Sequence, residues 1–171
     1  KGYHTLMKVH KRLLDAGFSH KIAVIGGGNE MENLLNQRKE LAVEDSFLLL
    51  DTQTNPYPYI KASDFFILPT QSESYPLVIG EVMCMRKPII STNVGGIAEM
   101  IDDGEDGILI QYNEDEMFEA MKGFLTKPEL VEKIKNGTAN AFQKFDEEEI
   151  YRQVTAVFEE QYQLKLENER S

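Results

Sequence analysis

Residues 64–110 read DFFILPTQSESYPLVIGEVMCMRKPIISTNVGGIAEMIDDGEDGILI, and this stretch decides the fold. The apolar run at 64–68 is followed by a helical pattern that starts near Tyr75, and the apolar run at 88–91 is followed by a glycine turn and a short helix. A further strand is expected at 107–110. Repeated strand, turn and helix units build parallel sheets, and ligands bind where the carboxyl ends of such strands meet.

The same alternation continues on both sides of this stretch. We therefore predict the α/β class, with one doubly wound, Rossmann-like parallel sheet, helices on both faces and further helices at the C-terminus. Residues 1–171 are expected to form a single domain. Two further strands are expected, at 21–25 and 47–50. The other expected helices lie at 4–16, 30–41, 56–62 (a short one), 97–101, 115–125, 128–145 and 147–166. Gly17 would stop the first of these helices, Asn113 would cap the helix at 115–125, and the last helix carries an apolar stripe with a polar end, formed by Ile150, Val154, Val157, Phe158 and Gln161.

Composition excludes several classes of partner. The chain has 171 residues, of which 42% are hydrophobic, and its net charge is -11. A surface that binds DNA, RNA or an anionic membrane needs clustered Lys and Arg, so these are not expected as partners. No apolar run approaches the roughly 20 residues of a membrane-spanning helix. Cys84 is the only cysteine and is expected to be a buried thiol, so we expect a reducing, cytoplasmic location.

Two glutamates flank the start of the helix in this central stretch. The free amides and dipole of a helix beginning near Tyr75 or Pro76 suit a phosphate. Glu73 would then lie beside that anion, an arrangement that makes sense if its carboxylate accepts hydrogen bonds from sugar hydroxyls. Glu81, farther along the helix, could reach a second hydroxyl-bearing group such as a ribose. On spacing alone, Glu73 as a helix cap and Glu81 as a surface residue are equally good interpretations.

The glycine turns allow two interpretations. Gly26-Gly27-Gly28 does not complete the dinucleotide fingerprint, because Met31 stands where the third glycine is required. A plain tight turn or a close approach of the backbone to a ligand remain open there. Gly95-Gly96 indicates a close approach more strongly, with a tight strand-to-helix connection as the alternative.

Neither a metal site nor a nucleophilic triad is expected. His4, His10 and His20 are scattered near the start, with no cysteine partner and no spacing that converges on one face. No glycine-flanked serine occurs, and Cys84 has no base near it in the sequence.

The segments ESYPLVIGEVM (73–83), KPIISTNVGGIAEMI (87–101) and DDGEDGILI (102–110) resemble the donor-binding, C-terminal half of the retaining GT-B glycosyltransferases of group 1, or family 4. The resemblance extends over nearly the whole chain. It implies that Glu73 holds the donor sugar, that Lys1 helps to neutralise the diphosphate, and that Glu81 holds the ribose. It assigns the remaining substrate contacts to Ser74, Tyr75, Leu77 and Val78 at the helix start and to Gly27, Leu50 and Asp51 nearer the base.

The chemistry that the resemblance implies is a hexosyl transfer from a nucleoside diphosphate to an acceptor hydroxyl. The donor would be a UDP-, GDP- or ADP-sugar, the product a polysaccharide or glycolipid, and the anomeric configuration would be retained. No metal or other cofactor is expected, since the helix dipole, its amides and Lys1 would stabilise the leaving diphosphate. A front-face route, in which the leaving phosphate takes the acceptor's proton, needs no protein nucleophile.

The chain departs from the family pattern at Lys1, before which the family has an arginine and a first strand. In the family that strand is central in the sheet, so we expect it to precede this sequence or to be replaced by a rearranged or intermolecular strand. The acceptor-binding N-terminal domain is also expected to be missing, and with it any membrane association. The isolated chain should then bind weakly and transfer nothing. The alternative function is a non-catalytic nucleotide-binding module of the same fold, and the failed glycine fingerprint disfavours a nicotinamide-dependent oxidoreductase.

Overall fold

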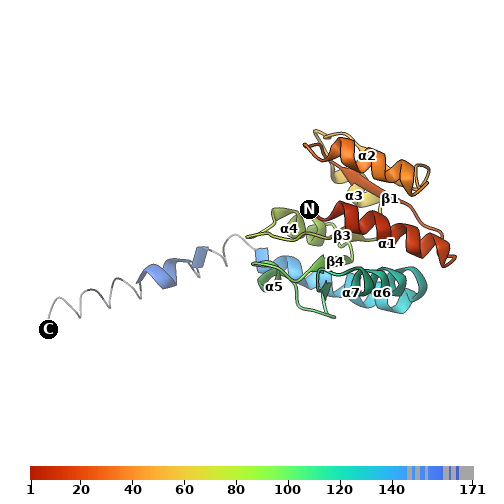
Figure 1. The fold of residues 1–171 in the computed structure, drawn as a ribbon. Coiled ribbons are helices and arrows are strands. Elements are labelled where there is room, and N and C mark those ends of the chain that lie inside the picture. The colour runs from red at the N-terminus through yellow and green to blue at the C-terminus, as the bar shows by residue number, and fades with distance from the viewer. Residues whose placement is uncertain (146–147, 149–150, 153, 160–161, 163–164, 166–171) are drawn as a thin grey trace.

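The computed structural model describes residues 1–145, 148, 151–152, 154–159, 162 and 165, and helices and strands alternate from α1 to α6 (Figure 1). The strands are β1 (Ile22–Ile25), β2 (Phe47–Leu50), β3 (Phe66–Leu68), β4 (Ile89–Thr92) and β5 (Ile108–Ile110). The helices are α1 (Tyr3–Asp15), α2 (Met31–Glu40), α3 (Tyr57–Ala62), α4 (Leu77–Cys84), α5 (Ile97–Met100), α6 (Glu114–Thr126) and α7 (Pro128–Ala141), followed by the 3-10 helix η1 (Phe142–Phe145).

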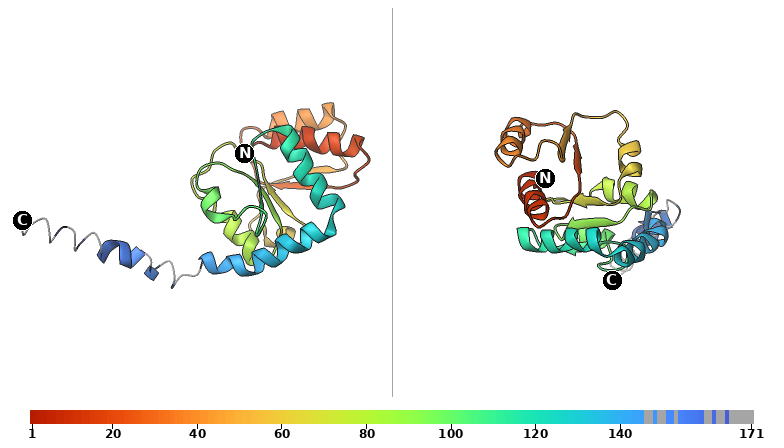
Figure 2. Two further views of the ribbon diagram at one scale, coloured as in Figure 1. Left: turned by 90° about the horizontal axis from the view of Figure 1, so that it is seen from below. Right: turned by 90° about the vertical axis from the view of Figure 1, so that its right-hand side faces the viewer.

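In the part of the chain that the structure describes, the strands form two parallel ladders. β1 pairs with β2 in a two-stranded sheet, and β4 lies between β3 and β5 in a three-stranded one. The left-hand view of Figure 2 shows the strands between α1 and α2 on one side and α3 and α4 on the other. The predicted α/β class with helices on both faces is therefore confirmed. The strands do not join into one sheet, however, because the ladders break between β1 and β3.

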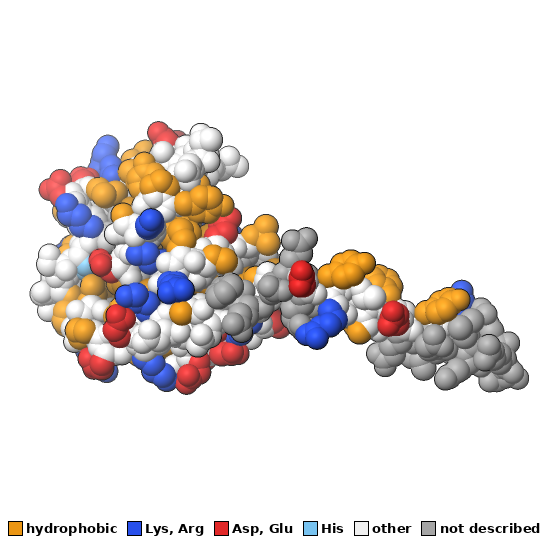
Figure 3. Space-filling view, turned by 180° about the vertical axis from the view of Figure 1, so that it is seen from behind, with side chains coloured by type: hydrophobic (Ala, Val, Ile, Leu, Met, Phe, Trp, Pro, Cys, Tyr) orange, Lys and Arg blue, Asp and Glu red, His pale blue; other side chains and the backbone are white. Residues whose placement is uncertain are grey.

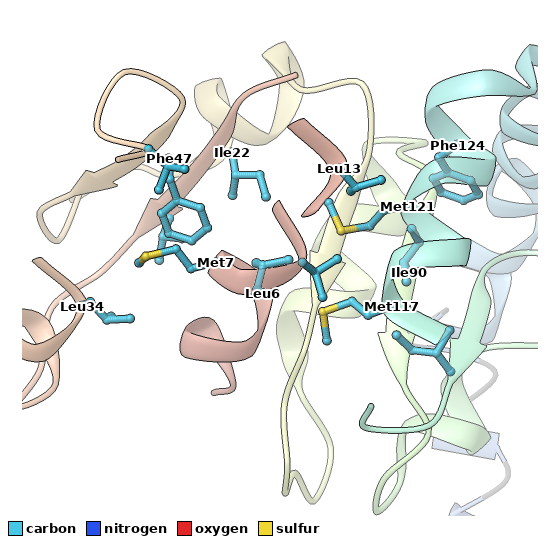
Figure 4. Packing of buried hydrophobic residues seen from close by; sticks show 14 of the residues in the cluster. Leu6, Met7, Leu13, Ile22, Leu34, Phe47, Ile90, Met117, Met121 and Phe124 are labelled. Carbon is cyan, nitrogen blue, oxygen red and sulfur yellow. The ribbon is translucent and has the colours of Figure 1, made fainter. Parts of the chain in front are cut away.

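Helix α1 joins the two ladders through a shared core. Leu6, Met7 and Leu13 of α1 are fully buried. Figure 4 shows Leu6 between Phe47 of the β1–β2 ladder and Met117 of α6, with Met7 on the side of Phe47 and Leu13 on the side of Met121. A second core lies under α4 and α5, where Ile79, Val82, Ile89 and Ile97 are buried, among others. The apolar periodicity of α1 thus stabilises the arrangement of the two ladders as well as the helix itself.

The end of α1 follows the predicted glycine stop. Gly17 adopts a φ of 88°, and its N–H donates to the carbonyl of Leu14 at 2.9 Å. The N–H of Phe18 donates to the carbonyl of Leu13 at 2.9 Å. These two bonds form a Schellman motif, which needs a left-handed residue that glycine supplies without steric cost. The chain therefore turns back along α1 after Gly17.

This return brings together two histidines that the sequence analysis treated as scattered. His20 Nδ1–H donates to the carbonyl of Phe18 at 2.9 Å, so His20 Nε2 is the acceptor for His10 Nδ1–H at 2.8 Å. His10 Nε2 in turn accepts from the hydroxyl of Ser46 at 2.8 Å. His10 is fully buried, and burial together with the nearby His20 lowers its pKa to about 4. His10 is thus a neutral link between α1 and the residues that precede β1 and β2.

Two details of the helices correct the sequence analysis. Cys84 is exposed because Ile79, Val82 and Met83 form the buried face of α4, and one further residue turns a side chain by about 100° away from that face. The helix predicted at 128–145 is α-helical only to Ala141, after which η1 continues it as a tighter turn. By contrast, Asn113 caps α6 as predicted, accepting a hydrogen bond from the N–H of Glu116 at 2.8 Å.

Near the C-terminus, residues 151–152 and 154–159 are helical and lie away from the rest of the chain (Figure 1). Val154, Val157 and Phe158 are exposed there, and Figure 3 shows apolar side chains on this segment. Ile150, Gln161 and the predicted helix ends at 147 and 166 lie outside the described residues. Within those that are described, no helix is long and apolar enough to cross a membrane.

Candidate functional site

The site lies where β3 gives way to α4. The loop from Pro69 to Pro76 connects them, and Thr70 at its start is buried. The carbonyl of Thr70 accepts a hydrogen bond from the hydroxyl of Thr92 at 2.5 Å. The hydroxyl of Thr70 lies within hydrogen-bonding distance of two acceptors, the carbonyl of Ser72 at 3.2 Å and the carboxylate of Glu73 at 3.4 Å. The loop is therefore fixed to the end of β4 before it reaches Glu73, whose side chain is only 16% exposed.

Helix α4 begins at this loop without a side-chain cap. Pro76 is its N-cap residue and donates no hydrogen bond, while Leu77, the first helical residue, is 75% exposed. Val78 follows and is half-buried. The backbone amides of a first helical turn carry the positive end of the helix dipole. The start of α4 is thus a place where an anionic group such as a phosphate is favoured.

The double glycine is explained by a close approach of two loops. Gly95 adopts a φ of 56°, and a Cβ there would lie 1.7 Å from the carbonyl oxygen of Glu73. A Cβ at Gly96 would lie 2.3 Å from the carbonyl oxygen of Ser74, which accepts a hydrogen bond from the N–H of Gly96 at 2.9 Å. Gly95-Gly96 therefore makes the close approach that the sequence analysis favoured, but the group approached is the backbone of the Glu73 loop.

Lys1 reaches the same loop from the start of α1. Gly2 adopts a φ of 75°, and a Cβ there would lie 1.8 Å from the carbonyl oxygen of Pro69. This close packing sets Lys1 beside the loop, and its ammonium group forms an ion pair with the carboxylate of Glu73. Lys1 remains 51% exposed. The residue expected to hold the donor sugar and the residue expected to neutralise the diphosphate are therefore in direct contact.

Glu81 is the fifth residue of α4 and is half-buried. Its Oε1 accepts a hydrogen bond from the hydroxyl of Tyr57, the first residue of α3, at 3.2 Å. This hydrogen bond raises the pKa of Tyr57, and the negative charge of Glu81 acts in the same direction. Tyr57 thus stays a protonated donor at neutral pH, and Glu81 stays available as an acceptor on its other oxygen.

The residues assigned near the base lie together at the ends of β1 and β2. The N–H of Gly26 donates to the carbonyl of Leu50 at 3.1 Å, and a Cβ at Gly27 would lie 3.3 Å from the hydroxyl of Thr52. Asp51 is exposed, and its carbonyl accepts a hydrogen bond from the side chain of Gln53 at 3.0 Å. The structure therefore groups Gly27, Leu50 and Asp51 at the end of the β1–β2 ladder. Ser74 and Tyr75, both exposed, belong to the Glu73 loop, which follows β3 in the other ladder.

Over the described ranges, no three His, Cys, Asp or Glu side chains gather as they would around a metal ion. The charged groups at the start of α4 are instead one ammonium group and one carboxylate. Such a set can bind an anion through the cation and the helix dipole, and neutral hydroxyls through the carboxylate.

Three residues of the site were missed from the sequence. Tyr57 was assigned only to a short helix, and no role was predicted for Thr70 or Gly2. The segment Tyr57-Pro58-Tyr59 comes before the strand that leads to Glu73, and its two tyrosines could have indicated Tyr57 as a candidate site residue. Nothing local marks Thr70 or Gly2, because their partners are Thr92 and Pro69 in other units.

Comparison with families of known proteins gives one match that covers most of the chain. The family model described as glycosyl transferases group 1 matches residues 1–141. An uncharacterized glycosyltransferase of Haemophilus influenzae is 32% identical over 132 residues, which are 76% of this chain and 37% of that protein. The N-acetylgalactosamine-N,N'-diacetylbacillosaminyl-diphospho-undecaprenol 4-alpha-N-acetylgalactosaminyltransferase of Campylobacter jejuni is 29% identical over 154 residues, 89% of this chain and 41% of that protein. The chain thus spans about two fifths of the length of these relatives.

Solved structures share the fold. The complex of Anabaena HepE with UDP-glucose has a TM-score of 0.79 at 22% identity and covers 94% of this chain and 45% of that one. The C-terminal domain of the group 1 family protein LpcC from Francisella tularensis has a TM-score of 0.74 at 18% identity, with 84% and 78% covered. At these identities the likeness concerns the fold.

Proposed function

Since this chain belongs to the glycosyl transferases group 1 family, we propose that it is the donor-binding half of a retaining GT-B glycosyltransferase. Its substrate is a nucleoside diphosphate sugar, and the whole protein transfers the sugar to an acceptor hydroxyl. The structure of HepE with UDP-glucose supports a UDP-sugar among the candidate donors, with GDP- and ADP-sugars as the others. A role in polysaccharide or glycolipid synthesis is supported by relatives such as CapM of Staphylococcus aureus, a capsular polysaccharide biosynthesis glycosyltransferase.

The observation that carries this proposal is the Lys1–Glu73 ion pair beside the uncapped start of α4. A diphosphate placed at the helix start would attract the ammonium group of Lys1. The carboxylate of Glu73 would then accept hydrogen bonds from hydroxyls of the donor sugar. One ion pair thereby supplies both groups that a sugar diphosphate needs at its linkage.

The other residues follow from this placement. The backbone amides of Leu77 and Val78 bind the phosphate region, with Ser74 and Tyr75 beside them, and Glu81 binds the ribose. Gly27, Leu50 and Asp51 border the base. Negative charge that develops on the leaving diphosphate is stabilised by Lys1 and the helix dipole, so the mechanism uses no metal. A front-face transfer, in which the leaving phosphate accepts the acceptor's proton, requires no protein nucleophile.

The acceptor site lies in the part of the longer family members that this chain does not match, and any association with a membrane lies in that part as well. We also propose that a sixth strand completes the sheet. In a doubly wound sheet of order 3-2-1-4-5-6, β2 and β1 are the first two strands, and β3, β4 and β5 are the last three. The break between β1 and β3 is then the place of strand 1, which would lead directly into α1.

A calorimetric titration tests the proposed function. The chain is titrated with UDP-, GDP- and ADP-glucose in the presence of EDTA, alongside the variants Glu81→Ala and Glu129→Ala. Glu129 is an exposed glutamate of α7 and serves as the matched control. We expect binding of one nucleotide class, weakened about tenfold or more by Glu81→Ala and unchanged by Glu129→Ala. Equal affinities for the two variants, or no binding by a longer version of the chain that includes the upstream strand, would contradict the proposal.

A further inference from the structure

Tyr57 links the loop near the base to the carboxylate assigned to the ribose. It begins α3, directly after the segment 51–56 that follows β2, and its hydroxyl donates to Glu81 Oε1 of α4 at 3.2 Å. Figure 2 shows α3 beside α4 in both of its views. Tyr57 therefore connects the β1–β2 ladder's end with the helix that starts at the phosphate position.

The segment that carries Tyr57 is itself held by side-chain hydrogen bonds. The N–H of Tyr57 donates to Asn55 Oδ1 at 3.2 Å, and the hydroxyl of Tyr59 donates to Gln53 Oε1 at 3.3 Å. Gln53 in turn donates to the carbonyl of Asp51. The phenol of Tyr57 thus projects from an anchored turn.

We propose that Tyr57 is a positioning residue for ribose recognition, holding Glu81 so that the free Oε2 faces the ribose hydroxyls. This inference rests on the proposed function of the site. A carboxylate on a surface helix samples several rotamers, and a hydrogen bond to one oxygen reduces the entropy lost when the other oxygen binds a ligand. Tyr57 is 47% exposed and its hydroxyl makes a polar contact with Glu81, so packing alone does not account for this hydroxyl.

Tyr59 offers a matched control within the same helix. Tyr59 is 41% exposed and its hydroxyl also makes one side-chain hydrogen bond, to Gln53 instead of Glu81. The variants Tyr57→Phe and Tyr59→Phe each remove one hydroxyl and leave the ring in place. A difference between them therefore reports on the contact with Glu81.

The test compares ribose with deoxyribose. The wild-type chain and the variants Tyr57→Phe, Tyr59→Phe and Glu81→Ala are titrated with UDP, GDP and ADP and with the 2′-deoxy and 3′-deoxy forms of whichever binds most tightly. We expect Tyr57→Phe to lower the affinity for the ribonucleotide about threefold to tenfold. The affinity for at least one deoxy form should change little, so that the ratio of the ribonucleotide affinity to the deoxynucleotide affinity becomes smaller. Tyr59→Phe should behave as the wild type.

The outcomes separate this inference from the proposed function. If Glu81→Ala weakens binding but Tyr57→Phe keeps the full preference for ribose, Tyr57 has no positioning role while the proposed site stands. If Tyr57→Phe weakens ribo and deoxy forms equally, its role is structural and the inference is wrong. Binding that does not depend on Glu81, or no binding of any nucleoside diphosphate, overturns both.

Discussion

At the scale of single residues, Lys1 and Glu73 form an ion pair beside the start of α4, so that each charge has a partner of opposite sign. In the proposed function, a bound diphosphate would compete for the ammonium group, because it carries more negative charge than one carboxylate and would lie on the helix dipole. Glu73 would then be released to accept hydrogen bonds from neutral hydroxyls. Such an exchange of partners would explain why an acidic side chain lies beside an anion site.

His10 gives a pH-dependent prediction. Its pKa is about 4 in the folded chain and near the ordinary 6.5 when unfolded. Between these values the unfolded chain binds more protons, so the free energy of unfolding should fall as the pH falls from 6.5 towards 4, by up to roughly 3 kcal/mol. Above pH 6.5 the contribution is fully present. Urea unfolding of the wild type and of His10→Asn across this range measures it.

His4→Gln is the control for this experiment, since His4 is also on α1 but partly exposed. It should keep the wild-type slope, whereas His10→Asn should flatten it. The explanation would be wrong if both variants lost stability with falling pH as steeply as the wild type.

The sequence predicted part of the residue-scale picture. Glu73 and Glu81 were identified because they follow one strand at a spacing that a helix start can use. The His10–His20 hydrogen bond was not, because it depends on the turn at Gly17 bringing the chain back along α1. Side chains separated by a turn have no fixed spacing in the sequence that would reveal their contact.

At the scale of elements, the Gly95-Gly96 turn should be intolerant of a side chain. Gly95→Ala would bring a methyl group to within 1.7 Å of the Glu73 carbonyl oxygen at a positive φ. We expect it to lower the free energy of unfolding by roughly 2–4 kcal/mol, and to displace the Glu73 loop. Chemical denaturation measures the stability.

The variant Gly104→Ala separates the effect of backbone strain from that of a steric clash. Gly104 also has a positive φ, 74°, but a Cβ there has no atom within 4 Å, so only backbone strain of about 1 kcal/mol is expected. Equal losses for the two variants would mean that the contact between the loops contributes nothing to stability.

Element types and the Asn113 cap followed from periodicity. The exposure of Cys84 did not, because a short helix with apolar residues on most sides hides which face is buried.

At the scale of the whole molecule, the break in the sheet leads to a prediction. β1 and β3 each have one hydrogen-bonded neighbour within the described chain, so each leaves an edge with unpaired backbone groups. A longer version of the chain that includes the upstream strand should slow amide hydrogen exchange in both β1 and β3, and leave β5 unchanged. Unchanged exchange in both β1 and β3 would exclude a strand between them.

The class of fold could be predicted because each strand and helix carries its own pattern. The break between the ladders was not visible in any single element, since it depends on which strands become neighbours. It can be understood only from the order of strands in the sheet. The bridging role of α1 is hidden in the same way, because its apolar stripe does not say that it faces two ladders.

The central claim is that a sugar nucleotide binds where Lys1, Glu73 and the start of α4 meet. Two-dimensional amide NMR during titration with UDP-, GDP- and ADP-glucose tests it most directly. With the donor that binds, we predict shifts for Glu73, Val78 and Gly96 that saturate together, and that the corresponding free nucleoside diphosphate shifts Val78 more than Glu73. Saturating shifts confined to α6 and α7, with these three amides unmoved, would contradict the claim.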